Sequence, residues 1–259
     1  MILDKIIERT QVRVEALRKN VQQRTGTNCT IFSENRFKNV QQRTGTNCTI
    51  PFVIAEVKKA SPSKGIIDPV FDYLNIAREY EAAGVAAISV LTELEFFMGS
   101  NEYLTEIKQH VNVPILRKDF IIDEIQIHES RAIGADIILL IAAVLETSKL
   151  REFLAIAKEL GLSALVETRD EAEIESAILA GAEMIGVNNR NLQTFEVDIE
   201  TSIRLRALVP KDKTFVSESG IESAVDVARL RAAGIDGVLI GETLMRAHDK
   251  GAKLKELLG

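Results

Sequence analysis

The chain has 259 residues, a length that suits a single α/β barrel domain. It is 46% hydrophobic but has no Trp and three Tyr, so its core must be built from aliphatic side chains. The formal net charge of −6, with no cluster of Lys and Arg free of acidic neighbours, argues against nucleic-acid binding. The longest apolar run, residues 137–145, is far shorter than the roughly 20 residues that a membrane-spanning helix needs.

Cysteine usage and the opening residues indicate a cytoplasmic location. Cys29 and Cys48 belong to neither a CxxC motif nor a Cys/His ligand spacing, and a reduced protein is the default for such a chain. The opening carries an acid, Asp4, and no apolar segment typical of a signal peptide. We therefore expect a cytoplasmic protein that binds neither nucleic acid nor membranes.

Residues 1–50 are predicted to form an N-terminal helical extension. Residues 2–18 have the period of an amphipathic helix, with apolar side chains at Ile2, Ile6, Ile7, Val14 and Leu17. Residues 19–31 then recur without change as residues 38–50. So long an exact repeat indicates a recent or engineered duplication, or an error in the sequence, rather than a functional array. Its Thr-Gly-Thr-Asn stretch is expected to break any helix.

A recurring pattern over residues 51–259 indicates the fold. A helix-like stretch ends in Gly, and an apolar run begins a few residues later, at Gly84, Gly134, Gly161, Gly181 and Gly234. Glycine can close a helix in the left-handed conformation, after which the chain turns back into a strand. The spacing corresponds to a unit of roughly 20–30 residues, the length of one βα repeat.

Eight short apolar segments fit this pattern. They are residues 52–56, 87–91, 114–118, 137–141, 163–167, 184–188, 214–218 and 237–240. None alternates strictly, as expected of strands buried on both faces. The amphipathic segment 147–158 and the candidate N-cap Ser223 place helices between them.

We therefore predict a (β/α)8 TIM barrel over residues 51–259. A doubly wound open sheet is the competing architecture. Eight evenly spaced units, and the absence of a Gly-rich dinucleotide turn after the first strand, favour the closed barrel.

Polar side chains stand where several of these strands end, which is where a TIM barrel has its active site. They are Glu56, Lys58, Lys118, Asp119, Glu167, Asn188, Asn189, Arg190, Glu218 and Ser219. Any strand must reach solvent somewhere, but polar ends on five strands favour a site. Lysines and glutamates in one mouth can have their pKa values driven apart, and can then divide acid and base work near neutral pH.

No metal or nucleophile motif accompanies these residues. His110, His128 and His248 fall on predicted helices or loops, so we expect no metal site. No nucleophile elbow or Ser/His/Asp arrangement occurs either.

The loops after the last two strands suit a phosphate group. In residues 218–221 and 240–243, Gly220 and Gly241 let backbone N–H groups approach an anion. Ser61 and the turn at residues 64–65 are placed to contribute from the first loop.

These motifs together resemble one family. Residues 55–65 (AEVKKASPSKG) closely resemble the first-strand signature of indole-3-glycerol phosphate synthases. The later motifs follow in family order: 91–93 (LTE) with Phe97 and 99–100 (GS), 114–120 (PILRKDF), 165–167 (LVE), 186–192 (GVNNRNL), 217–221 (SESGI) and 239–245 (LIGETLM). The resemblance covers residues 51–259 and the opening residues 2–6, and the combination is highly specific.

The resemblance implies a cofactor-free enzyme of tryptophan biosynthesis that closes an indole ring. The family's substrate is 1-(2-carboxyphenylamino)-1-deoxyribulose 5-phosphate, which loses CO2 and water. Lys118 is implied to be the general acid at the substrate carbonyl, and Glu167 the carboxylate that manages protons in later steps. Lys58 is implied to bind the substrate carboxylate and to take part in dehydration.

The remaining roles are implied in the same way. Glu56 orients Lys58, and Asn188 and Glu218 position the substrate hydroxyls and amine. The residues implied to bind the phosphate are Ser61, Gly220, Gly241 and Glu242. Phe97 and Phe120 are implied to pack against the aromatic ring, and Ser219 is expected to contact the substrate as well. We expect Arg190 to hold the site together through carboxylates. The phosphorylated small molecule is the one partner expected, for a monomer or weak homodimer.

Between about residues 14 and 50 the chain departs from the family, which has there an additional helical segment that closes over the barrel mouth.

Three rival hypotheses stay open. A Schiff-base aldolase of the same fold would use Lys118 to form an imine. A sugar-phosphate isomerase would explain the phosphate loops but not residues 56–65. In the third hypothesis, the altered segment between residues 14 and 50 leaves the protein folded but inactive.

Overall fold

The computed structural model describes residues 1–23, 51–191 and 194–259. The expected N-terminal extension is therefore described only as far as residue 23. The second copy of the repeat, 38–50, and residues 24–31 of the first copy lie outside the described residues.

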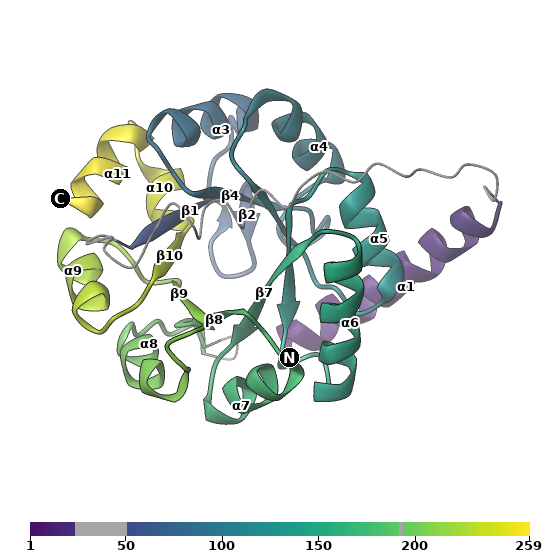
Figure 1. The fold of residues 1–259 in the computed structure, drawn as a ribbon. Coiled ribbons are helices and arrows are strands. Elements are labelled where there is room, and N and C mark those ends of the chain that lie inside the picture. The colour runs from purple at the N-terminus through teal and green to yellow at the C-terminus, as the bar shows by residue number, and fades with distance from the viewer. Residues whose placement is uncertain (24–50, 192–193) are drawn as a thin grey trace.

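Eight parallel strands form a closed barrel (Figure 1). They are β1 (Phe52–Val57), β4 (Ala87–Leu91), β5 (Ile115–Lys118), β6 (Ile137–Ile141), β7 (Ser163–Thr168), β8 (Met184–Asn188), β9 (Thr214–Glu218) and β10 (Gly237–Ile240). Each strand pairs with the next along the chain, and β1 pairs with β10 to close the ring. The predicted TIM barrel is confirmed, and every predicted strand agrees with the observed one to within one residue at either end.

Helices form an outer ring around the barrel (Figure 1). They are α3 (Tyr73–Ala82), α4 (Asn101–His110), α5 (Glu124–Ala132), α6 (Thr147–Glu159), α7 (Glu171–Ala180), α8 (Glu200–Leu205) with the 3-10 turn Arg206–Leu208, α9 (Ala224–Ala232), α10 (Glu242–Arg246) and α11 (Lys250–Leu258). The five predicted helix-closing glycines all have positive φ, between 71° and 97°. Ser223 caps α9 and forms a reciprocal capping box with Asp226, as its sequence position predicts.

A two-stranded antiparallel ribbon follows β1 in the first βα loop. It consists of β2 (Ala60–Ser61) and β3 (Gly65–Ile66), with Ser61 opposite Gly65. The ribbon brings the side chains of Ser61 and Ser63 to the mouth of the barrel, where their hydroxyl oxygens are 3.5 Å apart.

Two apolar clusters surround the strands. One fills the barrel interior and contains Ile54, Ala87, Leu116, Ile137, Leu139, Ile141, Leu165, Met184, Val216 and Leu239. The other lies between the strands and the helices, and contains the alternate strand residues such as Val53, Ala55 and Val57. Because side chains alternate along a strand, residues two positions beyond an interior residue also point inward. This alternation decides which side chains reach the mouth.

The N-terminal helix α1 (Ile2–Gln23) packs against α5 and extends five residues beyond the predicted segment. Ile6, Thr10 and Val14 are buried on its inner face. Within the described parts of the chain, no helix is both long and apolar enough to cross a membrane.

Candidate active site

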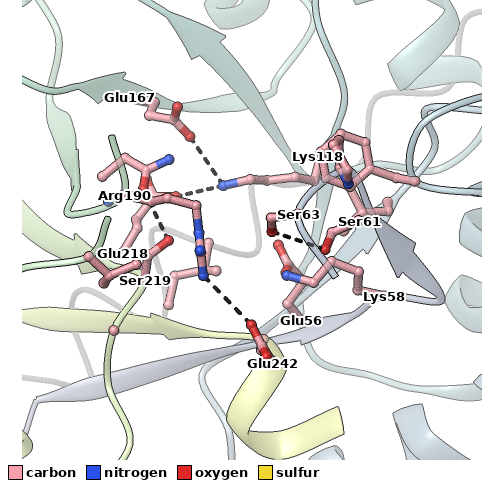
Figure 2. Close-up of a pocket in the computed structure, with 18 of the residues that line it drawn as sticks. Glu56, Lys58, Ser61, Ser63, Lys118, Glu167, Arg190, Glu218, Ser219 and Glu242 are labelled. Atoms are coloured by element: carbon pink, nitrogen blue, oxygen red, sulfur yellow. Dashed lines mark hydrogen bonds and ion pairs between the residues drawn. The ribbon is translucent and has the colours of Figure 1, made fainter. Parts of the chain in front are cut away.

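The inward positions nearest the carboxyl ends of the strands carry charged residues. Two residues after interior Ile54, Leu116, Leu165 and Val216 stand Glu56, Lys118, Glu167 and Glu218, respectively. Their side chains converge on a cavity of about 410 Å³ (Figure 2). This volume falls within the usual range for small-molecule sites.

All fourteen residues predicted to form the site line this one cavity. They are Glu56, Lys58, Ser61, Phe97, Lys118, Phe120, Glu167, Asn188, Arg190, Glu218, Ser219, Gly220, Gly241 and Glu242. The structure thus brings every predicted residue to one place, while the role of each stays a prediction.

Lys118 lies between two carboxylates at the centre of the site (Figure 2). Its Nζ donates to Glu218 Oε2 at 2.6 Å and to Glu167 Oε2 at 3.3 Å. The side chain of Lys118 is 15% exposed and that of Glu218 only 1%. The ammonium group is therefore fixed by two acceptors while it still faces the cavity.

Burial and neighbouring charges shift the pKa values of this pair. Burial alone would lower the pKa of Lys118, but the carboxylates of Glu218, Glu167 and Glu56 outweigh it and raise that pKa well above its ordinary value. Burial raises the pKa of Glu218 to about 7, aided by Glu167 and Glu56 and opposed by Lys118. Lys118 is thus a stable ammonium donor, and Glu218 can exchange a proton near neutral pH.

A second lysine–glutamate pair stands at the end of β1. Lys58 Nζ contacts Glu56 Oε1, and both side chains point inward because they are two residues apart. Burial alone would raise the pKa of Glu56, but Lys58 and Lys118 outweigh it and lower that pKa below its ordinary value. Glu56 and Glu218 therefore share one cavity in opposite electrostatic environments, as the sequence predicts for a site that divides acid and base work.

The ends of β8 and β9 hold each other in place. Asn188 Oδ1 accepts hydrogen bonds from Ser219 Oγ and from the backbone N–H of Arg190, both at 3.0 Å. Ser219 and Gly220 have φ values of 69° and 79°, so two successive residues are in the left-handed region. A Cβ on Gly220 would lie 2.4 Å from Val197 Cγ1, so glycine is required there for space as well as for conformation.

Glu242 gathers three cations at the edge of the cavity. Its carboxylate lies 3.6 Å from Arg190, 3.5 Å from Lys64 and 3.0 Å from Arg246. The Arg190 contact agrees with the expectation that this residue holds the site together through a carboxylate. The same group of residues also makes this edge of the site rich in positive charge.

Apolar residues form the remaining wall. The rings of Phe97 and Phe120 lie 6.2 Å apart and are inclined by 37°. The Glu93 carboxylate accepts backbone N–H groups of residues 95–97, and so fixes the loop that carries Phe97. Helix α1 adds Ile2, Leu3 and Ile6 to this wall, a contribution that the sequence analysis missed.

A buried polar network next to Lys118 was also missed. Asp119 is fully buried, and its Oδ1 accepts from Arg13 of α1 at 2.6 Å. Its Oδ2 accepts from Thr92 at 2.6 Å and from Arg117 at 3.2 Å. The signal available in the sequence was the Arg-Lys-Asp run at residues 117–119, in which alternation turns Arg117 and Asp119 outward and Lys118 inward.

The arrangement is suited to proton transfer to and from a bound anion. It offers two ammonium groups, carboxylates of different proton affinity and an apolar wall beside them. Among the residues that the structure describes, no group of three or more His, Cys, Asp and Glu side chains could hold a metal ion.

Comparison with known proteins identifies the family. The model of the family "Indole-3-glycerol phosphate synthase" matches residues 3–257. The relative of that name from Ruminiclostridium cellulolyticum is 54% identical over 100% of this chain and 99% of its own. The one from Endomicrobium trichonymphae is 53% identical over 99% of both chains.

A solved structure shares the fold at low sequence identity. The 3-hexulose-6-phosphate synthase from Salmonella typhimurium has a TM-score of 0.64 and 18% identity, and covers 80% of this chain and 96% of its own. That likeness concerns the barrel alone. The family model and the relatives, which span almost the whole chain, show more: this chain belongs to the indole-3-glycerol phosphate synthase family.

Proposed function

We propose that the chain converts 1-(2-carboxyphenylamino)-1-deoxyribulose 5-phosphate into indole-3-glycerol phosphate, with loss of CO2 and water. The observation that carries the proposal is the Lys118 ammonium, fixed by Glu167 and Glu218 beside an aromatic wall in a cavity of about 410 Å³. Membership of the family gives the reaction, and the geometry of the site supports a role for each residue.

Ring closure needs an acid at the ketone oxygen. The aromatic carbon that bears the carboxylate attacks the ketone carbon, and the oxygen gains electron density as the new bond forms. Lys118 faces the cavity, and its raised pKa keeps it charged as an ammonium group. It donates a hydrogen bond to that oxygen and releases its proton as the new bond makes the oxygen more basic. Loss of CO2 then leaves its bonding electrons in the ring.

Dehydration needs a second acid and a base. The hydroxyl group departs as water after it accepts a proton, and a proton leaves the neighbouring carbon to complete the indole. Lys58 is placed to supply the first proton, with Glu56 holding it at the end of β1. Glu167, on the opposite side of the barrel mouth, accepts the proton that leaves the carbon. Because ring closure and dehydration each need a proton donor, the two lysines are not redundant.

Substrate binding is divided between the two sides of the cavity. Phe97 and Phe120 pack against the anthranilate ring. The phosphate lies against the loops after β9 and β10, where Gly220 and Gly241 bring the backbone close, and Ser61 approaches from the first loop. We also propose that the enzyme is monomeric or weakly dimeric. A cytoplasmic location is in keeping with its two cysteines, which belong to no CxxC motif.

The aldolase alternative is disfavoured by the state of Lys118. An imine-forming lysine must be a neutral amine when it attacks a carbonyl, and sites that use one lower its pKa. Here three carboxylates raise the pKa of Lys118 instead. The ion pairs that keep Lys118 protonated thus oppose its use as a nucleophile.

The proposal is tested with the carboxyphenylamino ribulose phosphate as substrate. We expect a rise in indole fluorescence with time, and no lysine adduct when the mixture is treated with borohydride. A stable adduct on Lys118 without indole formation would establish the aldolase reading. A folded protein that gives neither would establish the inactive one.

A further inference from the structure

Gly186 lies where the Glu218 carboxylate meets the wall of the barrel. It is in the middle of β8, opposite Glu167 on one neighbouring strand and Val216 on the other. A Cβ added to Gly186 would stand 2.2 Å from Glu218 Oε1 and 3.1 Å from Leu165 Cδ1. Both distances are shorter than ordinary van der Waals contact, so no other residue fits without a shift of its neighbours.

The two oxygens of Glu218 have different environments. Oε2 accepts from Lys118 at 2.6 Å, whereas Oε1 is buried and has no hydrogen-bond partner among the described residues. Oε1 therefore rests against the bare α-carbon of Gly186. Lys118 on one side and Gly186 on the other leave the carboxylate one place to lie.

We propose that Gly186 is a positioning residue, whose missing side chain provides the space in which Glu218 lies against Lys118. This inference rests on the proposed function, in which that lysine is the acid of ring closure. It assigns Gly186 no contact with the substrate. Its effect on the reaction passes through Glu218.

The surroundings determine what a methyl group at residue 186 would do. The Glu218 carboxylate is the far end of a flexible side chain, whereas the Gly186 backbone is held in the ladder between β7 and β9. Glu218 would therefore yield first and turn toward the cavity. Lys118 would then keep Glu167, at 3.3 Å, and lose its nearer partner. Glu218 would become more exposed to solvent and would lose Lys118. Because burial raises its pKa by more than Lys118 lowers it, release from both would move the pKa from about 7 toward its ordinary value.

A double-mutant cycle on Gly186→Ala and Glu218→Ala tests the inference. We expect Gly186→Ala alone to lower kcat by about 10- to 100-fold with a change in KM of less than about threefold. We expect its pH–rate profile to lose the limb near pH 7 that Glu218 contributes. In the Glu218→Ala background, where the methyl group meets no carboxylate, the same substitution is expected to change kcat less than about twofold.

Gly237→Ala is the matched control. A Cβ there would lie 2.3 Å from the Phe52 ring, so it is an equally crowded strand glycine, but its neighbour carries no charge. We expect this variant to lose stability and to keep the wild-type shape of the pH–rate profile.

Two outcomes would overturn the inference: a wild-type profile in Gly186→Ala, or an equal loss of kcat with and without Glu218. If Gly186→Ala does not fold, recovery of folding in the double variant supports the inference, and its failure there contradicts it. A readout without turnover separates this inference from the proposed function. The dependence of unfolding free energy on pH between about 4.5 and 7 should flatten in Gly186→Ala whatever reaction the wild type catalyses.

Discussion

Removal of the Arg13 guanidinium should loosen helix α1 more than removal of any other arginine on it. Among the residues that the structure describes, three ion pairs join this helix to the barrel mouth: Arg9 to Glu95, Arg13 to Asp119 and Arg18 to Asp123. The three differ in burial. Asp119 is fully buried and Arg13 is 26% exposed, whereas Arg18 is 51% exposed.

The burial difference sets the expected energies. A hydrogen bond to a buried charged group contributes about 1.5–3 kcal/mol. Asp119 would keep Thr92 and Arg117 in Arg13→Gln, so the larger cost of an orphaned buried charge, about 3–5 kcal/mol, should not arise. The exposed Arg18 pair is expected to contribute much less, because solvent screens it, although its two shortest contacts are 2.8 and 2.9 Å.

The assay compares Arg13→Gln with Arg18→Gln as a matched control on the same helix. Ile2, Leu3 and Ile6 of α1 form part of the cavity wall, so we expect substrate binding to weaken when the helix is undocked. A loss of 1.5–3 kcal/mol in docking should then raise KM by about tenfold or more in Arg13→Gln. The control should change KM less than about fivefold.

Equal KM values for the two variants would refute this reasoning. So would a rise in KM for Arg13→Gln that is matched by no loss in urea stability, because both effects are attributed to the same contact. A fall in kcat with unchanged KM would place the effect at Lys118, the neighbour of Asp119, rather than at the docking of α1.

Three further changes have expected outcomes. Native Glu218, with a pKa of about 7, holds its proton to higher pH than the unfolded chain does, so its contribution to stability is complete below about pH 4.5 and is lost as pH rises to about 7. Between these two pH values, the free energy of unfolding from urea titrations should fall less in Glu218→Gln than in wild type. An equal fall in the two proteins would contradict the raised pKa of Glu218. Phe97→Ala should raise KM by about tenfold, from the lost aromatic contact, while Phe96→Ala, outside the cavity, should leave it unchanged; similar KM values would remove Phe97 from the ring site. Lys58→Met should slow dehydration by about 10²- to 10⁴-fold, and single-turnover traces should accumulate the ring-closed, decarboxylated intermediate; a uniform slowing without an intermediate would argue against a role in that step.

The strands could be predicted closely because each is largely buried on both faces, and five of them (β4, β6, β7, β8 and β10) follow a glycine-closed helix. β4, β6, β8, β9 and β10 begin and end at the predicted residues. β5 begins one residue later than predicted, at Ile115, since Pro114 has no N–H to donate to the ladder. The polar strand ends were equally legible, because the alternation that buries Leu116 and Leu165 also turns Lys118 and Glu167 inward.

Contacts between distant segments could not be predicted. Arg13 and Asp119 are 106 residues apart in the chain, and the hydrophobic pattern of neither segment indicates that the two are in contact. The same is true of Gly186 and Glu218, whose proximity depends on the register between β8 and β9. Alternation shows that both face inward, but register and side-chain packing decide that they touch. Residue roles that depend on such contacts therefore need the folded structure.

The wall that α1 adds to the cavity was hidden for a related reason. The helical period of residues 2–18 identifies an apolar face, but an apolar face can pack against any other. Ile6 is buried on the barrel, while Ile2 and Leu3 lie at the cavity as well. Placement of the helix over the mouth follows from its ion pairs with the loops after β4 and β5.

The most direct test of Lys118 as the acid of ring closure is single-turnover indole fluorescence of Lys118→Met, with substrate binding measured on the same protein. Methionine keeps the length of the side chain and removes the ammonium that Glu167 and Glu218 hold. We expect the rate of indole formation to fall by about 10²- to 10⁴-fold while the substrate Kd changes by less than about tenfold. Turnover by Lys118→Met within about threefold of the wild-type rate would contradict the proposed mechanism.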